Sequence, residues 1–215
     1  MKYPKAQSGV TKLWIVYLIG IIVTVLALFG SIFTGLFTDE AIKKIGVGAV
    51  GAGGLAGLVM LILELIGLHE ASNDNVNFGH AFLIVILGLV LTFIAGVLGA
   101  FNNDIVKQIG KYVEIAGSIA SIFAVTFTFK GIIILADHLG DKDMVKQGSK
   151  LIKIVWFVFI LSISLSLFAN IFSNGTADLV KTIVAVLAIV AAVLEIVGTI
   201  LTFIYYSRAK EMLKA

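Results

Sequence analysis

The feature that most constrains this chain is a pattern that occurs three times along it. A long apolar run, a short polar turn, a second apolar run and a longer polar loop follow one another with a period of about 70 residues. The three short turns share one motif, an acid, any residue, Ile or Val, Lys, any residue and Ile, at residues 40–45, 104–109 and 178–183. A period of this length is typical of repeated structural units. The pattern therefore predicts three helical hairpins of the same kind.

The apolar runs have the length of membrane spans. About 20 helical residues cross a hydrocarbon layer of roughly 30 Å, and the stretch from Leu13 to Thr38 contains no charged residue. The whole chain is 60% hydrophobic and 13% charged, with a mean hydropathy of +1.09. A secretory signal peptide has a shorter apolar core and a small-residue cleavage site, so we interpret the first run as a retained span.

The spans are expected to be α-helices, because a backbone in lipid must satisfy its own hydrogen bonds. The runs are uniformly apolar and do not alternate as barrel strands do. We predict an all-α polytopic membrane protein with a single transmembrane domain over residues 1–215, in three repeats at about 5–76, 77–146 and 147–215. The six predicted helices are 13–37, 46–68, 80–101, 113–137, 151–173 and 180–206.

The basic residues predict the orientation. Ten Lys and Arg residues lie at the N-terminus, the loop before the fifth span and the C-terminus, and five lie on the opposite side. Because basic residues are enriched in cytoplasmic loops, both termini are expected in the cytoplasm, with the protein in the cytoplasmic (inner) membrane. Trp14, Tyr17, Trp156, Tyr205 and Tyr206 lie at the same predicted interface, where aromatic rings prefer to be.

Small residues mark the even-numbered helices. They recur at a spacing of four or near it, which lets helix backbones approach closely in lipid. We predict that the second, fourth and sixth helices pack together at the centre through these residues. They are Ala49, Gly53 and Gly57; Ala116, Ala120 and Ala124; and Ala185, Ala188 and Ala192.

Three ionisable residues, Glu64, Lys130 and Glu195, lie inside predicted spans, all on even-numbered helices. A charge within the bilayer is costly and usually faces protein or water. One interpretation is a central polar cluster that serves an ion path or a ligand. The other is structural, with Glu64 and Lys130 reaching headgroup water and Glu195 protonated or paired with Lys130.

Other chemistries find little support. The chain has no cysteine, which excludes disulfides and thiolate sites, and its formal charge of +3 does not suggest a nucleic-acid partner. His69, His80 and His138 are expected in charged loops, and their spacing matches no compact metal motif. The glycine-rich segment 46–57 lacks the Lys-Ser/Thr ending of a phosphate-binding loop. We expect no metal, no cofactor and no enzymatic activity.

One connection between two predicted helices, which we call a joint, resembles a segment of known proteins. The segment Ile134–Met144, Ile-Leu-Ala-Asp-His-Leu-Gly-Asp-Lys-Asp-Met, followed by Lys150-Leu151-Ile152, is similar to a joint in a family of small prokaryotic multi-pass membrane proteins of unknown function. The Gly-Asp pair is absent from the equivalent joint at residues 71–74. The resemblance implies a polytopic protein of the cytoplasmic membrane and brings no activity or site residues with it.

Two functions are therefore open. The first is a non-catalytic integral membrane protein, a scaffold or a subunit of a membrane assembly, whose partners are the lipid bilayer and other membrane proteins or further copies of itself. The second is a small channel or transporter that uses Glu64, Lys130 and Glu195. A hollow centre would favour transport, and a centre packed with Gly and Ala would favour the scaffold.

Overall fold

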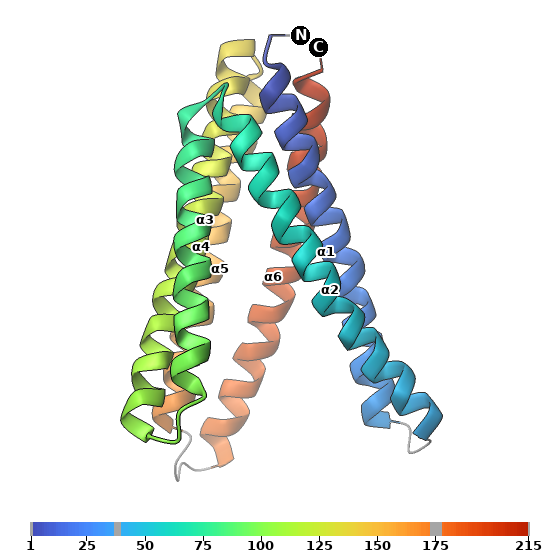
Figure 1. Cartoon of the computed structure of the whole chain (residues 1–215), viewed down its shortest axis with the longest axis vertical. Helices are drawn as coiled ribbons and strands as arrows, with labels where there is room; N and C mark the ends of the chain where they lie inside the picture. Colours follow the sequence, from blue (N-terminus) through green and yellow to red (C-terminus); the bar gives the residue numbers. More distant parts are fainter. Residues whose placement is uncertain (1, 37–39, 173–177, 215) are drawn as a thin grey trace. The chain divides into compact units, whose positions relative to one another are not determined.

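The described residues form six α-helices, which confirms the predicted fold class. They are α1 (Pro4–Leu36), α2 (Glu40–Ser72), α3 (Val76–Gly99), α4 (Asp104–Leu139), α5 (Lys142–Phe172) and α6 (Asp178–Met212) (Figure 1). This computed structural model describes the backbone of residues 2–36, 40–172 and 178–214, and their side chains except those of 27–53, 166–185, 188 and 189. Each of the six helices contains a stretch that is long and apolar enough to cross a membrane. The protein is a multi-pass integral membrane protein.

The helices extend beyond the apolar runs because polar residues cap their ends. Asn75 and Asn103 precede α3 and α4, and their side chains accept hydrogen bonds from the free backbone N–H groups of the first turn. Gly140 ends α4 with φ +79°, a left-handed conformation that suits glycine. Asp141 Oδ1 then accepts a hydrogen bond from the Met144 amide at 3.0 Å, at the start of α5. All six helices therefore begin before their predicted starts, and α2, α4 and α6 also extend past their predicted ends, whereas α3 ends two residues before its predicted end.

The same extension corrects the placement of the three histidines. They were expected in loops, but His69 lies in the last turn of α2, His80 in α3 and His138 in the last turn of α4. Helix formation continues through these polar residues because the caps beyond the apolar runs satisfy the free backbone groups of the helix ends.

The chain forms two compact units. The first comprises residues 1–74 and 206–215, and the second comprises residues 75–205. In the first unit α1 packs against α2, and the C-terminal end of α6 lies beside α1: the Tyr17 and Tyr206 rings are 5.0 Å apart, and Lys210 Nζ lies 3.9 Å from the centre of the Trp14 ring. Both chain termini therefore belong to one unit. The predicted single domain and its repeat boundaries remain predictions.

Helices α1 and α2 approach most closely at two glycines. A Cβ on Gly9 would collide with the Gly67 carbonyl oxygen and come within 2.8 Å of Ala71 Cβ, while a Cβ on Gly67 would lie 2.9 Å from the Gly9 carbonyl oxygen. The residues around this contact, Ala6, Val10, Leu68 and Ala71, are fully or almost fully buried. Only glycine allows two backbones to come this close.

In the second unit α4 lies between α3 and α5 (Figure 1). Of its most apolar stretch, 56% is buried, against 17% in α3 and 11% in α5. The face of α4 that meets α3 carries a small residue every seventh position, at Gly110, Gly117, Ala124 and Gly131, which we call the glycine seam. Seven residues make almost two helical turns, so the glycine seam stays on one face.

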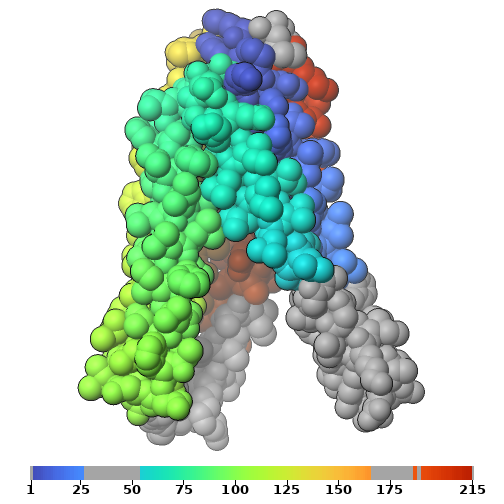
Figure 2. Space-filling model, viewed as in Figure 1, coloured from blue at the N-terminus to red at the C-terminus, as the bar shows by residue number. Residues whose placement is uncertain are grey.

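The glycine seam contacts α3 along its length. A Cβ on Gly110 would lie 3.3 Å from the Ala95 carbonyl oxygen, and one on Gly117 would lie 3.7 Å from that of Gly88. At the other end, a Cβ on Gly131 would come within 2.7 Å of Phe78 Cε2. The opposite face of α3 carries exposed apolar residues such as Leu83, Val90 and Phe93, which suits contact with lipid. Figure 2 shows this helix, in green, at the surface.

Candidate functional site

The three predicted intramembrane charges lie in different surroundings. Glu64 is half-buried on α2 of the first unit, whereas Lys130 and Glu195 are exposed in the second unit. Lys130 Nζ lies 5.4 Å from the centre of the Phe127 ring, and Glu195 accepts a hydrogen bond at its backbone oxygen from Thr199 Oγ1. No ion pair joins Lys130 to Glu195 in the part of the chain whose side chains are described. The central cluster remains a prediction.

The nine predicted packing residues are found in several environments. Ala120 and Ala124 are buried on α4, and Ala120 Cβ faces Gly88 of α3. Ala116 and Ala192 are exposed, and a Cβ on Gly57 would meet no atom within 4 Å. The side chains of Ala49, Gly53, Ala185 and Ala188 lie outside the described residues. A centre made by three even helices stays untested, and the described contacts of α4 with α3 involve the glycine seam together with Ala120.

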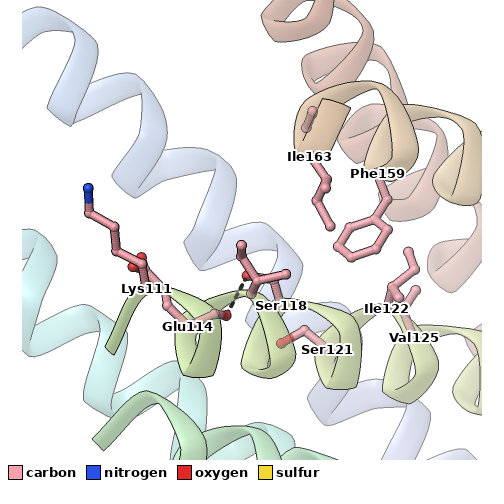
Figure 3. A pocket seen from close by; sticks show the side chains of 10 residues that line it. Lys111, Glu114, Ser118, Ser121, Ile122, Val125, Phe159 and Ile163 are labelled. Atoms are coloured by element: carbon pink, nitrogen blue, oxygen red, sulfur yellow. Dashed lines mark hydrogen bonds between the residues drawn. The ribbon is translucent and has the colours of Figure 1, made fainter. Parts of the chain in front are cut away.

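A groove between α4 and α5 is the main candidate site, and it was not predicted. Its volume is about 610 Å³, within the usual range of ligand pockets. Its polar residues are Lys111, Glu114, Ser118 and Ser121 on α4 and Ser162 on α5; its apolar residues are Ile115, Ile122, Val125, Phe159 and Ile163 (Figure 3). We call this the α4–α5 groove.

The sequence does contain a signal for this groove. Lys111, Glu114, Ser118 and Ser121 are separated by three or four residues, so they form one polar stripe that leads into the apolar middle of the helix. A search for single charges deep inside the spans does not identify such a stripe, because its charged residues lie near the end of the span. Which helix faces it cannot be read from the spacing.

Along α4 the charged residues and the serines of the α4–α5 groove precede its apolar end at Ile122 and Val125, and Ile115 is the apolar residue among them. Figure 3 shows Phe159 and Ile163 of α5 pointing toward Ile122 and Val125 of α4, away from Lys111 and Glu114. Ser118 Oγ donates to the Glu114 backbone oxygen at 3.1 Å, and Ser121 Oγ donates to that of Gly117 at 3.2 Å. Each hydroxyl oxygen keeps lone pairs that can accept a further hydrogen bond.

A tryptophan fixes the apolar end of this groove. Trp156 Nε1 on α5 donates to Thr126 Oγ1 on α4 at 3.0 Å, and Thr126 Oγ1 in turn donates to the Ile122 backbone oxygen at 2.8 Å. The Trp156 ring also meets Phe123 and Phe159 edge to face, with ring centres 5.3 Å and 6.2 Å apart. These contacts hold α5 against α4 beside the apolar wall.

A second polar cluster lies in the first unit and has structural partners. Lys12 Nζ lies 2.6 Å from Glu70 Oε2 and 3.0 Å from Ser8 Oγ. Asp74 Oδ2 accepts a hydrogen bond from the Ala6 amide at 2.6 Å, which caps the start of α1 just after Pro4. These contacts join α1 to the end of α2. We interpret this cluster as structural, because its hydrogen bonds and ion pair stabilise the packing of α1 against α2.

Metal ligands do not gather among the described residues. In that part of the chain no three His, Asp or Glu side chains lie close enough together to hold an ion. His80 instead meets Phe127 edge to face, with ring centres 5.3 Å apart. The α4–α5 groove therefore offers hydrogen bonds, two charges and an apolar wall as its binding chemistry.

Comparison of the chain with known protein families, with curated proteins and with solved structures finds no match.

Proposed function

We propose that this protein is a non-catalytic scaffold or a subunit of a membrane assembly, in the cytoplasmic membrane with both termini in the cytoplasm. The observation that carries the proposal is the continuity and close packing of the helices. Over the described residues each span is one uninterrupted α-helix, whereas transporter sites are usually built from broken helices. The close glycine contacts suit a rigid framework.

The helix crossings support a threefold repeat. Gly67, Gly131 and Tyr205 each lie 27 residues after the acid that opens their turn motif, Glu40, Asp104 and Asp178. Each of these residues contacts the beginning of the preceding odd-numbered helix. Gly67 meets Gly9, Gly131 meets Phe78, and Tyr205 meets Gly148. Two of the predicted hairpins, α1–α2 and α3–α4, pack closely at these equivalent positions, and the contact of Tyr205 with Gly148 lies at the corresponding position between α5 and α6.

The resemblance of residues 134–152 to small prokaryotic multi-pass membrane proteins agrees with this proposal. The joint has a definite structural role, because Gly140 ends α4 and Asp141 caps α5. A short, well-capped joint keeps neighbouring helices in a fixed relation.

An assembly role predicts specific neighbours in the membrane. Phe93 is 73% exposed on the outer face of α3, and the chain has no cysteine, so Phe93→Cys places one reactive thiol on that face. We expect a short bis-maleimide to produce discrete cross-linked species in native membranes. These species should persist when the membranes are fused with excess lipid, because collisions become rarer on dilution and assemblies do not.

The competing function is a channel or small transporter that uses Glu64, Lys130 and Glu195. We expect purified protein in liposomes to conduct protons, Na⁺ and K⁺ no faster than protein-free vesicles. Flux that the wild type supports and Glu195→Gln abolishes would instead establish transport. Absence of discrete cross-linked species, together with such flux, would overturn the scaffold proposal.

A further inference from the structure

The α4–α5 groove has the order of groups found in a phospholipid. Lys111 and Glu114 lie at one end, Ser118 and Ser121 follow with Ile115 between them and the charges, and Ile122 and Val125 form the apolar end on α4. Along α4 this order extends over residues 111–125, about 21 Å at 1.5 Å per residue. Such a length and order match a lipid headgroup followed by part of an acyl chain.

The depth of these groups in the membrane fits as well. Helix α4 has 36 residues and is about 54 Å long, so a hydrocarbon core of about 30 Å covers roughly its middle 20 residues. With the helix centred, that core begins near residue 112. Lys111 and Glu114 then lie at the polar interface, and Ile122 and Val125 lie within the hydrocarbon.

The α4–α5 groove contains one positive and one negative side chain, which favours a ligand that carries both a negative and a positive charge. Lys111 and Glu114 are exposed, and neither makes an ion pair within the described part of the chain. An anionic lipid would pair with Lys111 and leave the Glu114 carboxylate without a cation. A zwitterionic headgroup can satisfy both residues at once.

The serines distinguish between zwitterionic headgroups. Their hydroxyl hydrogens are donated to the α4 backbone, so their oxygens act as acceptors toward a ligand. A primary ammonium has three N–H donors, whereas the quaternary ammonium of choline has none. The ethanolamine headgroup therefore fits Glu114 and Ser118 better than choline does.

We propose that the α4–α5 groove binds one phosphatidylethanolamine molecule. Its phosphate pairs with the Lys111 ammonium, and its primary ammonium bonds to the Glu114 carboxylate and to Ser118 Oγ. One acyl chain lies along Ile122, Val125 and Phe159. This lipid site is independent of the proposed scaffold role, because it depends on the side chains of one groove and on no other copy or partner.

Trp156 provides a direct probe, because its ring touches Phe159 in the groove wall. In a Trp14→Phe background it is the single tryptophan, and bromine on an acyl chain quenches tryptophan fluorescence at short range. The full chain is reconstituted in phosphatidylcholine bilayers with increasing fractions of brominated phosphatidylethanolamine, phosphatidylcholine or phosphatidylglycerol. We expect saturable quenching with a preference of about three- to tenfold for the ethanolamine lipid over the choline lipid.

Variants separate the headgroup contacts from general lipid contact. Glu114→Gln should remove the preference for ethanolamine over choline, and Lys111→Met should weaken binding of both zwitterionic lipids. Lys107→Met is the matched control, because Lys107 is an exposed lysine of the same helix that does not line the groove. Circular dichroism and thermal unfolding check that each variant is folded. Should Glu114→Gln fail to fold, Ser118→Ala replaces it and should reduce the preference in part.

Two outcomes would overturn the proposal. Equal quenching by all three brominated lipids, unaffected by Glu114→Gln, would show ordinary boundary lipid beside α4 and α5. A preference for phosphatidylglycerol that Lys111→Met removes would show a site for anionic lipid. Neither outcome bears on cross-linking at position 93, so the lipid site and the scaffold are tested separately.

Discussion

The Phe78 ring of α3 packs directly on the α-carbon of Gly131 in α4, and Phe78 is fully buried there. The ring fills the space that a side chain at position 131 would otherwise take. Gly131 is also the last member of the glycine seam, so this contact fixes how far the two helices extend past each other. The contact packs α3 against α4 at the end of the hairpin that lies away from the connecting loop at residues 100–103.

Gly131→Ala should destabilise the protein by about 1–3 kcal/mol, because the new Cβ would lie 2.7 Å from Phe78 Cε2 in a well-packed site. Thermal unfolding in detergent measures the change. Gly96→Ala is the control on α3, since a Cβ there would meet nothing within 4 Å. Adding Phe78→Leu to Gly131→Ala should recover part of the loss; a Gly131→Ala protein as stable as Gly96→Ala would refute this packing.

The hydrogen bond from Trp156 Nε1 to Thr126 Oγ1 should couple α5 to α4 by about 0.6 kcal/mol, the average found for such bonds between membrane helices. A double-mutant cycle of Trp156→Phe and Thr126→Val measures this coupling through unfolding free energies. The two changes should be less damaging together than their sum predicts. Additive losses would mean that the bond contributes nothing to stability.

Glu195 and Lys130 should act independently of each other, because both side chains are exposed and Lys130 Nζ faces the Phe127 ring. The unfolding free-energy changes of Glu195→Gln and Lys130→Met should add within about 0.5 kcal/mol. A buried pair would behave differently, since loss of one partner alone would cost about 3–5 kcal/mol and loss of both would restore stability. Such a rescue would establish the pair that the sequence suggested.

Both termini should be reached from the same side of the membrane, because Trp14 near the start and Lys210 near the end of the chain are in contact. Single cysteines at Ser8, Asn103 and Lys214 test this with an impermeant thiol reagent on intact cells. The basic-residue bias further predicts labelling at position 103 only. Opposite behaviour of positions 8 and 214 would contradict the structure, and labelling of both would reverse the predicted orientation.

The amino-acid sequence by itself determined the class of fold and the number of helices. In lipid, the backbone of a long uncharged apolar run such as Leu13–Thr38 forms a helix, because the helix satisfies all of its hydrogen bonds internally. The helix ends were less predictable, because they depend on polar caps at Asn75, Asn103 and Asp141 that lie outside the apolar runs. A hydropathy pattern reflects the burial of apolar residues in lipid and does not include the hydrogen bonds that such caps make.

Tertiary structure alone decided which small residues touch another helix and which polar residues share a groove. Ala116 and Ala120 look alike in the sequence, yet only Ala120 is buried, because it lies on the face of α4 that meets Gly88 of α3. In the same way Lys111 and Glu114 become part of a candidate site only because α5 lines the same groove with Phe159 and Ser162. Periodicity along one helix gives the direction of its faces. The neighbour that each face meets is set by packing between helices, which the short-range pattern of a sequence does not contain.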